Sequence, residues 1–93
     1  MKPSEFIFND LRIPERYCGV IERYITEHMY PGSFFKAVLC NDLKEACSSA
    51  DDINIKLLPV YVAYLYNYAP AGCWGCPEKF EEWLAQGKEQ TDD

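Results

Sequence analysis

The sequence lacks a long hydrophobic run, and positive charge is scarce. No run reaches the ~18 apolar residues that a membrane span requires, since the longest, residues 57–68, is bounded by Lys56 and interrupted by Asn67. Nine Lys and Arg face 15 Asp and Glu, for a net charge of −6. This charge argues against a general DNA or RNA binder, which needs cations to replace phosphate counterions. Residues 1–5 also carry an acid and a proline, unlike a signal peptide. We therefore expect no membrane contact, no direct binding to duplex nucleic acid and a cytoplasmic location.

Histidine is nearly absent, and the cysteines are poorly spaced for a metal site. His28 is the only histidine, and a lone histidine near a helix end is usually structural. Of five cysteines, only Cys73 and Cys76 form a C-x-x-C pair, whereas a structural zinc ion wants four ligands. The odd count and the absence of an export signal predict reduced thiols. We expect no cofactor, with zinc at Cys73 and Cys76 as the alternative. Because no pair of base and nucleophile is apparent, we expect no enzyme activity.

Apolar residues are plentiful and concentrate in the middle of the chain. Hydrophobic residues make up 48% of the sequence and aromatic residues 15%, so a packed core is feasible. Residues 57–68 are apolar on nearly every side, as in the centre of a small domain or in an interface. Pro59 would clash with the carbonyl of Ile55, so residues 50–68 form either one kinked helix or two helices. A strand is the less favoured alternative, because no other segment offers it a convincing partner.

Three other segments are predicted to form helices that could cover this central stretch. Residues 13–29 carry apolar side chains at three- to four-residue spacing and end before Pro31. Ser33 is a good N-cap for a helix over residues 34–48. A last helix spans residues 77–87, with proline at its start and glycine at its end. The sequence therefore predicts an all-α fold: a compact bundle of three to five helices around a buried, proline-kinked central helix.

The 93 residues are expected to form one domain. Residues 1–11 are predicted to be an N-terminal arm that places its aromatic side chains on the domain. Residues 12–87 are predicted to be the single helical domain, and residues 88–93 a disordered polar tail.

Five residues are candidates for ligand binding. Arg12, Arg16 and Arg23 fall within roughly 40° of one another if the first helix begins at or before Arg12. Such a stripe could receive a phosphate or an acidic partner, and its alternative is a solvated helix face. Ser33 precedes a helix N-terminus, whose free N–H groups can bind an anion, although simple capping by Ser33 is the favoured interpretation. Trp74 could stack on a nucleotide base.

The tyrosines of the central stretch are candidates for an interface. Tyr61, Tyr64, Tyr66 and Tyr68 belong to the stretch that is apolar on nearly every side. The apolar surface left over predicts a homo-oligomer or a protein partner.

The order of several motifs resembles that of a known family. The motifs are residues 31–34 (Pro-Gly-Ser-Phe), 37–46 (Ala-Val-Leu-Cys-Asn-Asp-Leu-Lys-Glu-Ala), 50–51 (Ala-Asp), Asn54, 64–70 (Tyr-Leu-Tyr-Asn-Tyr-Ala-Pro) and 73–75 (Cys-Trp-Gly). Together they look like small accessory proteins of tailed phages and prophages, over about residues 13–85. In that family the position of Cys76 is often serine.

The resemblance implies an accessory role in the cytoplasm of a host cell. Small phage proteins of this kind often inhibit a host defence, either by binding a host protein or by sequestering a signalling nucleotide. We therefore expect a non-enzymatic binding protein that counters host defence. A small zinc-stabilised structural or regulatory module is the alternative.

Overall fold

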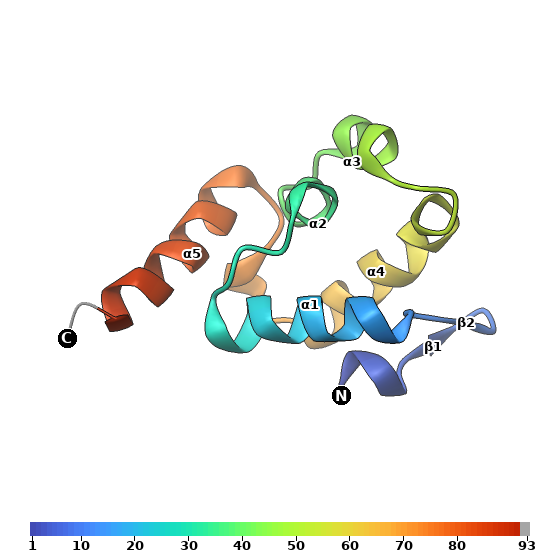
Figure 1. Cartoon of the computed structure of the whole chain (residues 1–93), viewed down its shortest axis with the longest axis horizontal. Helices are drawn as coiled ribbons and strands as arrows, with labels where there is room; N and C mark the ends of the chain where they lie inside the picture. The colour runs from blue at the N-terminus through green and yellow to red at the C-terminus, as the bar shows by residue number, and fades with distance from the viewer. Residues whose placement is uncertain (92–93) are drawn as a thin grey trace.

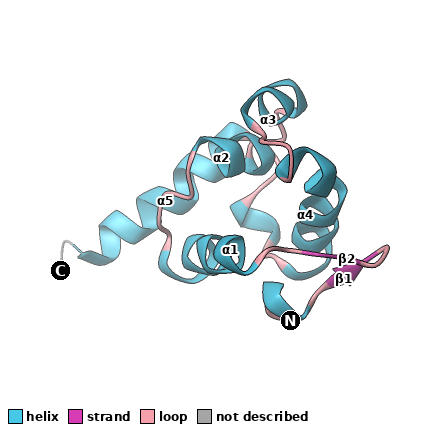
Figure 2. Cartoon of the chain, turned by 45° about the vertical axis from the view of Figure 1, so that its right-hand side comes forward, coloured by secondary structure: helices cyan, strands magenta, loops and turns pink. Residues whose placement is uncertain are grey.

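The computed structural model describes residues 1–91, with side chains for residues 1–87. Within these residues, five α-helices follow a short N-terminal segment (Figure 1). The helices are α1 (Glu15–Glu27), α2 (Ser33–Leu39), α3 (Leu43–Ser49), α4 (Asn54–Tyr68) and α5 (Pro77–Thr91). Strands within residues 1–91 are confined to one small hairpin beside α1 and α4 (Figure 2). The predicted all-α fold is therefore confirmed.

The N-terminal segment is a hairpin rather than a single extended arm. Strand β1 (Ile7–Phe8) pairs in antiparallel fashion with β2 (Leu11–Arg12). The two turn residues between the strands, an Asn-Asp pair, have φ of 51° and 65°. Asn and Asp enter this left-handed region more readily than most residues, which suits a two-residue hairpin turn. Phe6 is buried and packs edge-on against Tyr64 and Tyr68, so this segment does place an aromatic side chain on the domain.

The central stretch is one helix, with Pro59 inside α4. The Asp51 carboxylate caps its start, accepting hydrogen bonds from the N–H groups of Ile53 and Asn54 at 3.1 and 2.7 Å. Proline removes the hydrogen bond to the Ile55 carbonyl, and Ile55 is 40% exposed, so water can replace that bond. Of the two arrangements left open by the sequence, the single helix is the one observed.

The helix predicted over residues 34–48 is wrong, because two helices occupy this segment. Asn41, with φ of 61°, takes the left-handed position that ends α2. The N–H of Asp42 donates to the Ala37 carbonyl at 2.8 Å, and its carboxylate accepts from the N–H of Glu45 at 3.2 Å to cap α3. Asn and Asp suit a helix C-terminus and N-cap better than a helix interior, which explains the break.

Glycine positions correct two predicted helix ends. The N-cap of α2 is Gly32, with φ of 96°, and Ser33 is the first helical residue rather than the cap. Helix α5 continues through Gly87 to Thr91, so the tail predicted from residue 88 is wrong as far as residue 91. Residues 92–93 of that predicted tail lie outside the described residues. A Cβ at Gly87 would lie 2.7 Å from the Cβ of His28, so this glycine permits a close approach between α5 and the end of α1.

Side chains of α1 and α5 fix the two helices together. The Trp83 indole N–H donates to the Tyr24 carbonyl at 2.8 Å, and His28 Nδ1 donates to the Trp83 carbonyl at 2.8 Å. Tyr24 stacks on Phe80 with ring centroids 5.5 Å apart, and its hydroxyl donates to the Cys73 carbonyl at 2.7 Å. His28 therefore has the structural role at a helix end that the sequence predicts.

Candidate functional site

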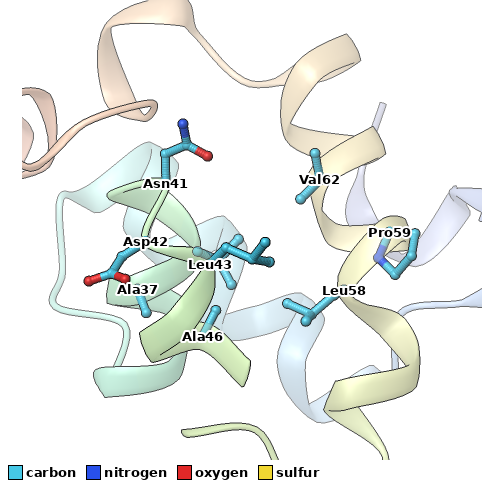
Figure 3. Close-up of a pocket in the computed structure, with 9 residues that line it drawn as sticks. Ala37, Asn41, Asp42, Leu43, Ala46, Leu58, Pro59 and Val62 are labelled. Carbon is cyan, nitrogen blue, oxygen red and sulfur yellow. The ribbon is translucent and has the colours of Figure 1, made fainter. Parts of the chain in front are cut away.

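An apolar groove of about 290 Å³ lies between the α2–α3 pair and α4 (Figure 3). Its base is formed by Ala37 and Ala46, which are almost fully buried. One wall is Leu43 of α3, and the opposite wall is built by α4. The α4 wall consists of Leu58, Pro59 and Val62. None of the side chains in either wall is charged, so the groove is suited to apolar groups.

Leu43 is more exposed than Val62, the other exposed large hydrophobic residue of the groove, at 71% against 44%. The break at Asn41–Asp42 makes Leu43 the first residue of α3, and its side chain points across the groove toward Leu58 and Val62 (Figure 3). Asp42 points away from α4 in the same view. Fully burying a leucine side chain stabilises a protein by ~1.5–3 kcal/mol. Most of this stabilisation is absent here, because Leu43 remains exposed. A partner that covers Leu43 would recover it.

The outer face of α4 extends the apolar surface beyond the groove. Ile55, Pro59, Val62 and Tyr66 follow one another at spacings of four, three and four residues, so they share one helix face. Ile55, Val62 and Tyr66 are exposed at 40%, 44% and 78%. A contiguous exposed apolar surface of this kind typically marks an interaction site.

A second hollow, of about 470 Å³, adjoins the groove and shares Ala37 and Asp42 with it. It lies where α2, α3 and the start of α5 meet. We call it the acidic hollow, because three carboxylates and one ammonium group line it. These charged residues are Asp42, Glu45, Glu81 and Lys36.

The three arginines predicted as one stripe do not share a helix. Helix α1 begins at Glu15, after Pro14, so Arg12 lies on β2 instead. The Arg16 guanidinium lies 4.7 Å from the centroid of the Tyr17 ring. The Arg23 guanidinium folds back over Gly19, with one nitrogen 3.0 Å from the position of a Cβ there. The expectation of a three-arginine stripe on α1 is therefore wrong.

Ser33 and Trp74 lie on other elements than the arginines. Ser33 is exposed and lines the acidic hollow, where an anion would face the carboxylates of Glu45 and Glu81. Trp74 is partly buried against the core, directly after the short 3-10 helix of Ala71–Cys73. The next residue, Gly75, donates its N–H to the Leu39 carbonyl at 2.7 Å, at the opposite end of α2 from Ser33.

The four candidate interface tyrosines divide into two pairs. Tyr61 and Tyr64 are 1% and 3% exposed, so their prediction as surface interface residues is wrong. Their hydroxyls donate to Asn54 Oδ1 at 2.7 Å and to the Met1 carbonyl at 2.5 Å. Burial raises the pKa of both hydroxyls, that of Tyr64 to about 12. Tyr66 and Tyr68 are exposed at 78% and 44% and remain available to a partner.

The C-x-x-C pair is divided between the core and the surface. Cys73 is fully buried, and burial raises its pKa to about 11, so its thiol is protonated at neutral pH. Cys76 is partly buried, and all five cysteines are free thiols. Within the described residues, no three His, Cys, Asp or Glu side chains gather in a group that could hold a metal ion. Zinc at Cys73 and Cys76 stays a prediction.

Comparison with known protein families, curated proteins and solved structures finds no match to this chain. The fold and the site therefore define a class only: a small all-α domain that presents an apolar groove. No helix within residues 1–91 is long and apolar enough to cross a membrane. The resemblance to phage accessory proteins stays a prediction.

The groove is the feature that sequence reasoning missed. If residues 34–48 formed the single helix expected from the sequence, its periodicity would place Leu43 on one face with Phe35 and Leu39, which are buried. The available signal was the Asn41–Asp42 pair, whose residue types favour a helix end followed by a new N-cap. Once the helix is divided there, Leu43 no longer follows the periodicity of α2.

Proposed function

We propose that this chain is a non-enzymatic protein-binding module, and that its partner covers the groove between α2–α3 and α4. The observation that carries this proposal is Leu43, which is 71% exposed and faces an α4 wall that carries no charged side chain. A monomeric protein gains nothing from such a surface, whereas a binding protein gains the burial energy of each apolar side chain that its partner covers.

The same surface favours protein binding over nucleotide sequestration. A nucleotide site needs cations or N–H groups for the phosphates and a stacking surface for the base. The five predicted residues are spread over four parts of the chain, with only Arg16 and Arg23 on the same element, and the groove walls carry no cation. Among the described residues, no buried side-chain nitrogen or oxygen lacks a hydrogen-bond partner, so no unsatisfied polar group points to an internal ligand site.

The cellular location and the biological role of the module are inferred from the resemblance of its sequence motifs to those of phage accessory proteins. The module acts as a phage accessory protein in the cytoplasm of the host cell, where it binds a host protein and thereby counters a host defence. Tyr66 extends the contact beyond the groove, because it lies on the outer face of α4 and tyrosine is enriched at the centres of protein interfaces. Tyr68 lies on another side of α4, against Phe6 and Tyr64.

Site-specific photo-cross-linking in expressing bacteria tests this proposal. A photoreactive amino acid replaces Val62 in the groove, and a matched control places it at exposed Glu27 on α1. The expected result is a defined adduct with a host protein from position 62 only, which disappears when Leu43→Ser is added. Equal labelling from both positions, or labelling that ignores Leu43→Ser, would contradict the proposal.

Native mass spectrometry of the gently purified protein tests the nucleotide alternative. Added mass of the size of a nucleotide at each site would favour sequestration, and it would overturn the assignment of a protein partner if Leu43→Ser left it unchanged. The same spectrum reports bound zinc and the number of subunits.

A further inference from the structure

The groove and the acidic hollow together form one surface of two chemical kinds. The groove is apolar, and the hollow carries Asp42, Glu45, Glu81 and Lys36. Ala37 and Asp42 belong to both, so a bound segment that leaves the groove at this end passes directly over the carboxylates. This continuity constrains the partner further than the groove does by itself.

The shape of the groove indicates the conformation of the bound segment. An extended peptide that adds a strand needs an exposed sheet edge, and the only strands within residues 1–91 are two-residue β1 and β2, outside the groove. A proline-rich segment docks on aromatic side chains, and none of the residues that line the groove is aromatic. An amphipathic helix remains. It presents apolar side chains at i and i+3 or i+4 along one face, and these side chains suit an aliphatic groove between helices.

The charge of the hollow indicates what flanks those apolar side chains. Three carboxylates against one ammonium group attract cations, and the whole chain carries a net charge of −6. A second copy of the chain would bring the same carboxylates toward one another, which is unfavourable. Lysine or arginine on the partner would instead lie within reach of Asp42, Glu45 and Glu81.

Resting on the proposed function, we infer that the partner supplies a basic amphipathic helix. Its apolar side chains at i and i+3 or i+4 occupy the groove against Leu43, Leu58 and Val62. Its Lys or Arg side chains, about one turn further along, lie over the acidic hollow. The apolar anchors supply most of the affinity, and the charges set the orientation of the helix and its salt dependence.

Selection from a displayed library of random helical peptides tests this inference without knowledge of the natural partner. The full chain is immobilised, and binders that also bind the variant Leu43→Ser/Val62→Ser are removed. The expected enriched peptides carry two apolar residues at i and i+3 or i+4, and Lys or Arg about one turn away. Fluorescence anisotropy then measures the affinity of the best synthetic peptide for each variant.

Charge reversal separates the acidic hollow from the groove. Glu45→Lys/Glu81→Lys is expected to weaken binding of that peptide about tenfold, and added salt to weaken binding to the unmodified chain. The matched control is Glu27→Lys on α1, which changes charge away from both hollows and is expected to leave the affinity unchanged. Circular dichroism and thermal unfolding check that every variant is folded.

Three outcomes would overturn the inference, and they are distinguishable from one another. If the enriched peptides are apolar and lack basic residues, and their affinity is unaffected by reversal of Glu45 and Glu81, the inference of a basic helix is wrong. The proposed protein-binding function would still stand. The absence of any peptide that depends on Leu43 would count against the groove itself, and so against the proposed function. Self-association in sedimentation experiments that is lost in Leu43→Ser would assign the groove to a second copy of the chain.

Discussion

The two faces of α4 carry similar residues but differ in how those residues are used. On the inner face, Val60, Tyr61 and Tyr64 are at most 3% exposed, and both tyrosine hydroxyls are hydrogen-bonded. On the outer face, Val62 and Tyr66 are exposed at 44% and 78%. Composition therefore does not separate the core of this protein from its candidate binding surface. The difference lies in whether another element of the chain covers the residue.

Alkaline pH should have the largest effect on the inner face, because it acts on several buried groups at once. Burial raises the pKa of Tyr64 to about 12 and that of Cys73 to about 11, and it also raises the pKa of Tyr24 and Tyr61. Unfolded tyrosine has a pKa of about 10. The stabilisation from neutral, buried hydroxyls is thus fully present below about pH 10 and is lost as the pH rises toward the folded values.

Chemical denaturation at a series of pH values measures this effect. The free energy of unfolding should stay level up to about pH 8, because unfolded cysteine has a pKa of about 8.5. It should fall as the pH passes that value, through Cys73, and more steeply above about pH 10, through the buried tyrosines. A level profile through pH 12 would contradict the burial of these groups.

Truncation of Phe80 should have the largest effect of any single substitution considered. Phe80 is fully buried and stacks on Tyr24. Phe80→Ala is expected to lower the free energy of unfolding by ~3–5 kcal/mol, through lost burial and the cavity that remains. Urea denaturation checks it. A loss below about 1 kcal/mol would mean that α5 is not part of the core, since surface substitutions rarely exceed that value.

Removal of one hydroxyl from each face of α4 should sharpen the comparison. Tyr61→Phe leaves the buried Asn54 amide without its partner and is expected to cost ~1–3 kcal/mol. Tyr66→Phe removes the same atom from a side chain that is 78% exposed, and it should change stability by less than ~0.5 kcal/mol. Equal effects in thermal unfolding would show that the two faces do not differ as described.

Two Gly→Ala substitutions should have opposite effects on the stability of the protein. In a helix, Gly→Ala alone stabilises by up to ~1 kcal/mol. At Gly19 the new Cβ would meet only the flexible end of Arg23, so Gly19→Ala is expected to stabilise the protein. At Gly87 it would lie 2.7 Å from the Cβ of His28, so Gly87→Ala is expected to destabilise it and to shift the melting temperature downward. A stabilising Gly87→Ala would argue against the close approach of α5 to α1.

Leu43→Ser should have the smallest effect on stability and a large effect on binding. Its side chain is 71% exposed, so the free energy of unfolding is expected to change by less than ~0.5 kcal/mol. Binding of the cross-linked host protein, or of a selected peptide, should be lost. A stability loss as large as that of Tyr61→Phe would place Leu43 in the core, and the groove would then have no exposed wall.

Helix positions could be predicted from the sequence where apolar periodicity and end signals agree. Pro14 and Pro31 bracket α1, and Pro77 starts α5. The prediction failed where residue type and periodicity disagree, as at Asn41–Asp42. There, two residues suited to a helix end outweighed an apolar pattern that runs on beyond them.

The candidate site could not be predicted, for a related physical reason. Exposure of Leu43 follows from the angle between α2 and α3, and the burial of Tyr61 and Tyr64 follows from the long-range placement of α2 and the N-terminal hairpin. The periodicity of one segment reports neither the angle between two helices nor the placement of segments that are distant in sequence. Gly87 shows the same limit, because a glycine that ends a helix and a glycine that admits a neighbouring helix are identical in sequence.

The hydrogen bonds that hold the elements of this fold together also constrain how its sequence can change over generations. The side chains of Tyr24, Trp83 and Tyr64 all donate to backbone carbonyls, at Cys73, Tyr24 and Met1. Every amino acid supplies a backbone carbonyl, so a substitution at a residue that only accepts keeps the hydrogen bond. The donors are side-chain O–H and N–H groups, which no aliphatic residue can replace. Diverged copies of this gene should therefore keep their tyrosine and tryptophan donors while residues such as Cys73 change identity.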